Sequence, residues 1–128
     1  GRGFLCGALH DVPTLNAKDI RRAMPRFEPD HHARNLRLLP GYKALAQEAG
    51  CTPAQLALAW LLHKRPFIVP IPGTTSVGHL REDLAAAAVR LDAALVARLE
   101  AHINQSTVSG NRYGPQSRTE VDTEEFPD

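Results

Sequence analysis

One short segment limits what this chain can fold into. Residues 67–71, FIVPI, are the only convincing β-strand in the sequence. Their apolar character is continuous rather than alternating, which is typical of a parallel strand covered on both faces. Pro70 cannot donate a hydrogen bond to a neighbouring strand, so it belongs near the end of this one. A single parallel strand cannot form a sheet, and we expect its neighbours to lie outside this chain.

The helix before this strand has the clearest start signal in the sequence. Thr52 is a typical N-cap, Pro53 suits the first helical position, and Gln55 completes a Thr-x-x-Gln capping box. In residues 54–62 only the glutamine is not apolar. A helix that is apolar all round has to be buried on most sides, and 128 residues offer little to bury it. Met24 is the only methionine, so we expect a piece of a longer protein.

Two further helical regions precede this pair. A short helix is expected around residues 17–24, and a longer one over residues 30–49. Pro40 falls inside the longer region, where it either kinks the helix or restarts it, because proline removes an internal hydrogen bond. Gly50 is well placed to end that helix.

Two more helices follow the strand. The first spans residues 77–88, with Thr75 or Ser76 as its cap, and the second starts at Asp92. The expected apolar stripe of the first consists of Val77, Leu80, Leu84 and Ala87 or Ala88, and that of the second of Leu95, Leu99 and Ile103. Residues 104–128 contain few large apolar residues, so we expect a tail that is flexible after Tyr113.

Composition and charge exclude several classes of function. The chain has 15 basic and 14 acidic residues, without the clustered basic stripe that binds nucleic acid. Its densest apolar stretch, residues 54–62, is about half as long as a membrane span needs. Cys6 and Cys51 lie far apart, which favours a reducing compartment and a cytoplasmic location. The six histidines show no metal-ligand spacing, so no metal is expected.

The turn after the strand is the most informative candidate for chemistry. Residues 72–76, PGTTS, lead directly into a helix. The N-terminus of a helix binds anions because its free N–H groups and its dipole point toward the ligand. Glycine lets a ligand approach the backbone, and the hydroxyls add donors. No lysine is present, so this is not a P-loop. Two interpretations stay open: a phosphate-binding turn, or a plain connection with a helix cap.

Two other motifs are weaker. Residues 1–7, GRGFLCG, nearly match the dinucleotide-binding fingerprint, but the third glycine is one position late. A flexible glycine-rich loop is therefore favoured there. Residues 50–60 are similar to the start of a helix-turn-helix unit, although the helix is too apolar to lie in a DNA groove. A non-enzymatic helical module, either a DNA binder or a scaffold, is the alternative function.

Several short segments occur in a fixed order along the chain. They are residues 1–5 (GRGFL), 25–27 (PRF), 52–62 (TPAQLALAWLL), 68–75 (IVPIPGTT), 79–86 (HLREDLAA) and 109–113 (SGNRY). Together they resemble the C-terminal part of an aldo/keto reductase of the bacterial- and plant-type branch. The resemblance implies an α/β fold, a (β/α)8 TIM barrel, of which this mostly helical chain is the last third. Residues 1–103 would supply the loop after strand seven, strand eight and flanking helices, and residues 104–128 a C-terminal tail.

The same resemblance implies an oxidoreductase that uses NADP(H), or alternatively NAD(H), to reduce a small aldehyde or ketone to an alcohol. The expected cofactor-binding residues are Gly1, Arg2, Gly3, Pro72, Gly73, Thr74, Thr75, Ser76, His79, Glu82 and Asp83. The first three would lie near the pyrophosphate and the others near the adenosine phosphate. Ser76 stands where the family often has a cation, and Asp83 where it usually has Asn. These two departures weaken the expected preference for NADP over NAD.

The catalytic residues of the family have no counterpart in this chain. The resemblance implies a tetrad of Asp, Tyr, Lys and His that maps before residue 1. The chain has only two tyrosines, Tyr42 and Tyr113, and neither lies in the family's motif. We therefore expect the chain by itself to be catalytically inactive.

Overall fold

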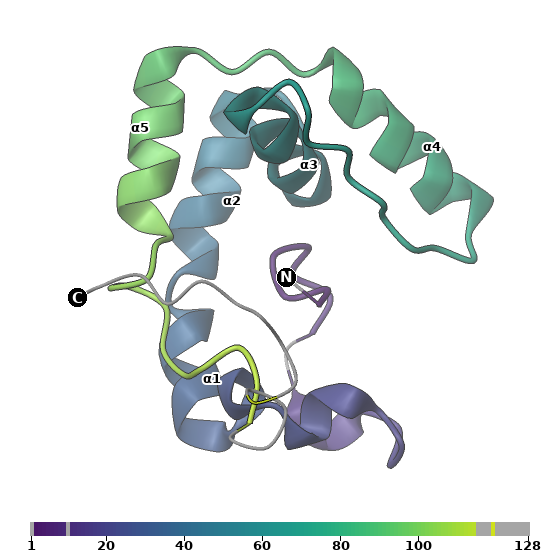
Figure 1. Ribbon diagram of the computed structural model, residues 1–128, viewed down its shortest axis with the longest axis vertical. Coiled ribbons are helices and arrows are strands. Elements are labelled where there is room, and N and C mark those ends of the chain that lie inside the picture. Colours follow the sequence, from purple (N-terminus) through teal and green to yellow (C-terminus); the bar gives the residue numbers. More distant parts are fainter. Residues whose placement is uncertain (1, 10, 115–118, 120–128) are drawn as a thin grey trace.

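Helices follow one another along the chain, and the connections between them are short except for residues 65–76. The computed structural model describes residues 2–9, 11–114 and 119. Its α-helices are α1 (Pro29–Leu36), α2 (Leu39–Glu48), α3 (Pro53–Lys64), α4 (Val77–Ala85) and α5 (Ala93–His102). Its 3₁₀ helices are η1 (Val12–Thr14), η2 (Ile20–Ala23), η3 (Pro25–Phe27) and η4 (Ala86–Ala88). Figure 1 shows α2 beside both α3 and α5, with α4 on the outside of this group.

The predicted start of α3 is confirmed in detail. Thr52 Oγ1 accepts a hydrogen bond from the Gln55 amide at 3.2 Å, and the Thr52 amide donates to Gln55 Oε1 at 3.0 Å. This reciprocal pair satisfies amides that have no partner within the helix. Asp92 caps α5 as predicted, since its Oδ1 accepts from the Leu95 amide at 2.7 Å.

At Pro40 the structure shows a restart rather than a kink. α1 ends at Leu36, and Pro40 lies in the first turn of α2, where its missing N–H costs little. The short helix predicted around residues 17–24 is a single 3₁₀ turn, η2, which is capped by Asp19 because that side chain accepts from the Arg21 amide.

The predicted stop at Gly50 is also confirmed. The Gly50 amide donates to the Gln47 carbonyl at 3.0 Å, and the Cys51 amide donates to the Ala46 carbonyl at 3.0 Å. These two bonds form a Schellman motif. Gly50 has a φ of 66°, a left-handed conformation in which a side chain would be strained. α2 and α3 therefore meet at a sharply defined corner.

The prediction of a parallel strand over residues 67–71 is wrong for this chain. Within the described part of the chain, Phe67 lies in a turn closed by a 3.2 Å hydrogen bond from the Ile68 amide to the Arg65 carbonyl, and residues 68–71 form no strand. Phe67, Val69 and Ile71 are 78%, 79% and 92% exposed. A strand needs a neighbouring strand to receive its hydrogen bonds, and the described residues provide none.

The main apolar cluster lies where α2, α3 and α5 meet. Its buried members are Tyr42, Ala46, Leu56, Leu95 and Leu99. The last two confirm the predicted stripe on α5. α2 and α5 approach closely at Gly41, where an added Cβ would lie 2.6 Å from His102 Cε1. The His102 ring is held there by its Nε2, 2.7 Å from the Leu38 carbonyl.

The apolar stripe predicted for α4 is not buried. Val77, Leu80 and Leu84 are all exposed, and α4 has no buried residue. Only Ala86, in the 3₁₀ turn η4 that continues α4, is buried against α3. The spacing of the stripe is helical, as predicted, but the structure that it would face is not among the described residues.

A second apolar cluster lies near α1 and includes part of the predicted tail. Leu9, Met24 and Phe27 are its buried members, and Tyr113 packs against them. The buried side chain of Asn35 binds the main chain of Ser109 twice, with distances of 2.9 and 2.8 Å. Residues 109–113 thus pack against the first part of the chain. Residues 115–118 and 120–128 of the predicted tail lie outside the described residues.

Candidate functional site

The predicted phosphate-binding turn is an exposed loop that ends at the first residue of α4. Residues 72–75 are exposed and Ser76 is half-buried. An added Cβ at Gly73 would meet no atom within 4 Å. The loop is therefore open to solvent on the side where a ligand would approach.

Two hydroxyls in this turn organise the start of α4. Thr74 Oγ1 accepts from the Ser76 amide at 3.1 Å, and Ser76 Oγ accepts from the His79 amide at 3.3 Å. Ser76 is thus the N-cap, one of the two residues that the sequence indicated. The amides of Val77 and Gly78 make no hydrogen bond within the described part of the chain. Free amides at a helix N-terminus are suited to an anion.

The three candidate residues farther along α4 differ in their surroundings. His79 is exposed, while Glu82 and Asp83 are half-buried. The Glu82 carboxylate accepts a hydrogen bond from Thr52 Oγ1 at 2.6 Å, and its carbonyl accepts from Gln55 Nε2 at 3.1 Å. Glu82 therefore joins α4 to the capping box of α3, a contact that the sequence did not indicate.

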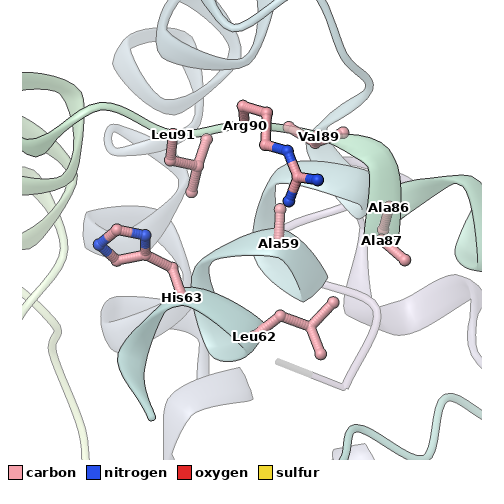
Figure 2. Close-up of a pocket in the computed structure, with 8 residues that line it drawn as sticks. All are labelled: Ala59, Leu62, His63, Ala86, Ala87, Val89, Arg90 and Leu91. Carbon is pink, nitrogen blue, oxygen red and sulfur yellow. The ribbon is translucent and has the colours of Figure 1, made fainter. Parts of the chain in front are cut away.

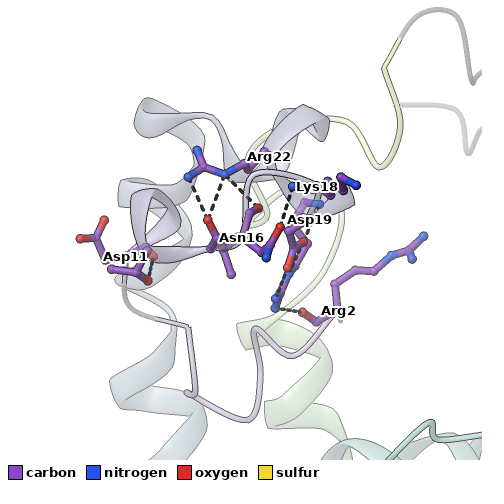
Figure 3. A network of polar contacts seen from close by, with 9 residues as sticks. Arg2, Asp11, Asn16, Lys18, Asp19 and Arg22 are labelled. Atoms are coloured by element: carbon purple, nitrogen blue, oxygen red, sulfur yellow. Dashed lines mark hydrogen bonds and ion pairs between the residues drawn. The ribbon is translucent and has the colours of Figure 1, made fainter.

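The N-terminal candidates lie in a tight loop. Gly1 lies outside the described residues, whereas Arg2 and Gly3 adopt φ values of 54° and 80°. The Arg2 carbonyl accepts from Arg21 Nη1 at 3.2 Å. Figure 3 shows the Arg2 side chain extending away from the polar network that holds its main chain. The Arg2 guanidinium is therefore not used to hold this loop.

The anchor of this loop is an ion pair that the sequence analysis missed. Arg21 donates to Asp19 from Nε at 2.9 Å and from Nη2 at 2.7 Å. These bonds lower the pKa of Asp19 to about 2 and raise the pKa of Arg21. The sequence pattern that could have predicted this ion pair is an Asp two residues before an Arg. Asp often caps a helical turn, and it can then reach the side chain of the Arg that follows.

The two groups of candidate residues are not brought together at the turn that begins α4. Cys6 is near enough to Glu82 and Asp83 for their charges to raise its pKa, although burial is the larger cause. The loop of Gly73 and Ser76 begins α4 at the opposite end, and Figure 1 shows it at the edge of the molecule, apart from the N-terminal segment. Figure 1 thus shows the N-terminal segment and the turn that begins α4 in separate parts of the molecule.

Both tyrosines have a packing role in the fold. Tyr42 is buried and donates from its hydroxyl to the Pro53 carbonyl at 2.8 Å. Its pKa is raised by burial first and then by the neighbouring Cys6 and Cys51. Tyr113 packs in the second apolar cluster. A proton donor needs a pKa near the working pH, so Tyr42 is poorly suited to that role.

The described residues show neither a metal-binding cluster nor a membrane-spanning helix. Among these residues no group of three or more His, Cys, Asp or Glu side chains is arranged to hold a metal ion. No helix in the described ranges combines the length and the apolar character that crossing a bilayer requires.

Comparison with known proteins gives a consistent match. The model of the aldo/keto reductase family matches residues 2–104. Aldo-keto reductase yakc [NADP(+)] of Schizosaccharomyces pombe is 36% identical over 129 residues, which cover 99% of this chain. Aldo-keto reductase str7 of Strobilurus tenacellus is 30% identical over 127 residues, again 99% of the chain. In both cases the chain spans 38% of the length of the relative.

Proposed function

The chain belongs to the aldo/keto reductase family, and on that premise we propose that it supplies the part of a (β/α)8 barrel that holds the adenosine-phosphate end of NADP(H). When bound, this cofactor supplies the hydride that reduces an aldehyde or ketone to an alcohol. The carbonyl substrate and the catalytic tetrad would be held by the rest of the barrel. The bacterial- and plant-type branch stays a prediction, as does a cytoplasmic location.

The start of α4 is the observation that carries this proposal. It combines an open glycine position at Gly73, two free amides at Val77 and Gly78, and the hydroxyls of Thr74 and Ser76. The loops after strands seven and eight commonly bind phosphate in such barrels. The absence of a cation at Ser76 supports use of both NADP(H) and NAD(H), because the 2′-phosphate is what separates the two.

Titration of the chain with NADPH tests the proposal. We expect amide chemical shifts to change in residues 73–83, and adenosine 2′,5′-bisphosphate to compete for the same positions. Gly73→Ala should weaken binding, because the new methyl group occupies the side on which the ligand approaches while touching no atom of the protein. Gly114→Ala is the matched control, since a Cβ there also meets nothing. Shift changes spread evenly over the chain, or no binding, would disprove the proposal.

The chain by itself should not reduce carbonyl compounds. Tyr42 is buried with its hydroxyl donated to Pro53, and Tyr113 packs against apolar residues, so neither can act as a tuned proton donor. We expect no loss of NADPH absorbance with a generic aldehyde such as 4-nitrobenzaldehyde. Turnover above the protein-free rate that is abolished by Tyr42→Phe would contradict this expectation.

A further inference from the structure

A cavity of about 330 Å³ lies between α3 and the segment that follows α4. Its apolar walls include Ala59, Leu62, Ala86 and Leu91. Ala59 and Ala86 are buried, so the floor is built of small side chains. The volume is at the lower end of the range of small-molecule sites, roughly 300–1,000 Å³.

Two basic side chains, His63 and Arg90, make the accessible lining of this cavity more polar than apolar. Figure 2 shows Arg90 reaching over α3 toward Ala59, with His63 on one side and Leu62 on the other. Within the described part of the chain, Arg90 forms no hydrogen bond and no ion pair, and no hydrogen bond engages the His63 ring. A guanidinium carries five donors in a planar fork, and all five are available here.

The acidic residues nearest to this pair in sequence or packing are engaged elsewhere. Asp92 caps α5. Glu100 accepts from Lys64 Nζ at 2.6 Å, and its pKa is lowered chiefly by that bond and in smaller part by His63. The positive charge of Arg90 therefore has no carboxylate partner in the cavity.

We propose that this cavity binds a small organic carboxylate with an apolar body. The planar guanidinium of Arg90 matches the two oxygens of a carboxylate, and the imidazole of His63 can donate one further hydrogen bond. The alanine floor and the leucine walls receive the apolar body, whose transfer from water is favourable. None of these residues belongs to the proposed cofactor site, so the two proposals can be tested independently.

Benzoate is a suitable probe, with benzyl alcohol as its uncharged counterpart and inorganic phosphate as an anion without an apolar body. The chain is titrated with each at low micromolar protein concentration, and binding is followed by amide chemical shifts. We expect benzoate to shift the amides of His63 and Arg90, and to bind at least about ten-fold more tightly than either of the other two compounds.

Three variants test whether benzoate binds in this cavity. Arg90→Leu should weaken benzoate binding about ten-fold or more, since it removes the charge but keeps much of the side-chain bulk. Ala87→Leu fills the cavity from an exposed position and should weaken benzoate without removing a charge. Arg34→Leu, an exposed change on α1, is the matched control and should leave binding unchanged. Circular dichroism of each variant shows whether the helices are retained.

Three results would overturn the proposal. The first is no binding of benzoate at millimolar concentration. The second is equal binding of benzoate and benzyl alcohol, or of benzoate and phosphate. The third is benzoate binding that persists in both Arg90→Leu and Ala87→Leu. NADPH shifts confined to residues 73–83 would be unaffected by any of these results, so the proposed function would survive them.

Discussion

Ser76 links helix capping to the proposed choice of cofactor. Its Oγ accepts from the His79 amide, and the family resemblance places the same residue where a cation often faces the 2′-phosphate. Replacing it therefore changes two properties at once: the stability of α4 and the charge next to the ligand. The two can be separated, because alanine removes the cap without adding charge.

Ser76→Arg should tighten NADPH binding and leave NADH binding nearly unchanged. A charge-assisted contact to a phosphate contributes roughly 1.5–3 kcal/mol, which corresponds to at least about ten-fold in affinity. Loss of the cap costs α4 about 1 kcal/mol, and Ser76→Ala carries the same loss as the control. Both cofactors are titrated against all three proteins. An equal change for NADPH and NADH would show that Ser76 does not face the 2′-phosphate.

At the scale of elements, the corner between α2 and α3 also fixes α4. Thr52 Oγ1 accepts from the Gln55 amide and donates to the Glu82 carboxylate. One hydroxyl therefore starts α3 and anchors the helix that carries the candidate site. No other hydrogen bond between side chains joins α4 to α3 within the described residues.

Thr52→Val should lower the stability of α4 more than that of α5. It keeps the shape of threonine but removes the N-cap, which costs about 1 kcal/mol, and leaves the Glu82 carboxylate without its donor. Hydrogen exchange of individual amides measures the effect, with α5 as the internal reference. Thr52→Ser retains the hydroxyl and should behave like the unmodified chain. Equal loss of protection in both helices would contradict this role of Thr52.

The ion pair of Asp19 and Arg21 makes the stability of η2 and the Arg2 loop depend on pH. The pKa of Asp19 is about 2 in the folded chain, against about 3.9 in an unfolded one. The stability that the ionised carboxylate contributes is therefore complete above about pH 4 and is lost as the pH falls toward 2. Protonation would release Arg21, which also holds the Arg2 carbonyl.

A carboxyl titration by NMR should show the Asp19 midpoint near pH 2. Arg21→Lys should raise this midpoint toward the ordinary value, because an ammonium group cannot reproduce the bonds from Nε and Nη2. Arg22→Lys is the control, since the Arg22 guanidinium binds the carbonyls of Pro13, Leu15 and Asn16 instead. A midpoint near 4 in the unmodified chain would disprove the assignment.

Elements with local signals could be predicted from the sequence, and those that depend on distant partners could not. The capping box at Thr52 and the stop at Gly50 each depend on atoms within five residues. The prediction of a strand over residues 67–71 failed because the hydrogen bonds of a strand need other strands as partners. In the candidate site, the capping role of Ser76 was predictable because it too depends only on residues close in sequence. The bond from Thr52 to Glu82 spans 30 residues, and no local pattern encodes such an approach.

For the whole molecule, the exposed apolar residues between α3 and α5 dominate the expected behaviour in solution. Phe67, Val69 and Ile71 are each more than three-quarters exposed, and Val77 and Leu84 on α4 are exposed at 66% and 68%. Apolar surfaces of this kind mark contacts with other structure, or they cause association. The barrel that the family implies would cover them.

The isolated chain should therefore unfold in a broad transition that depends on protein concentration. Thermal circular dichroism at two concentrations, with light scattering, measures this. Replacing Val69 and Ile71 together by lysine should reduce the association, because both side chains lie outside the core. Adding lysine at Thr74 and Thr75 is the control, since it adds equal charge and removes no apolar surface. A sharp, monomeric transition in the unmodified chain would contradict the expectation.

The two hydrogen bonds between Asn35 and Ser109 have a consequence for synthesis on the ribosome. Both polar ends of the Asn35 side chain are satisfied by a residue 74 positions later. At roughly 5–20 residues per second, Ser109 is translated about 4–15 s after Asn35. During this interval α1 has to remain accessible, because an amide side chain enclosed without partners is costly. The order of translation thus makes the docking of residues 109–113 one of the last steps by which a nascent chain could complete this fold.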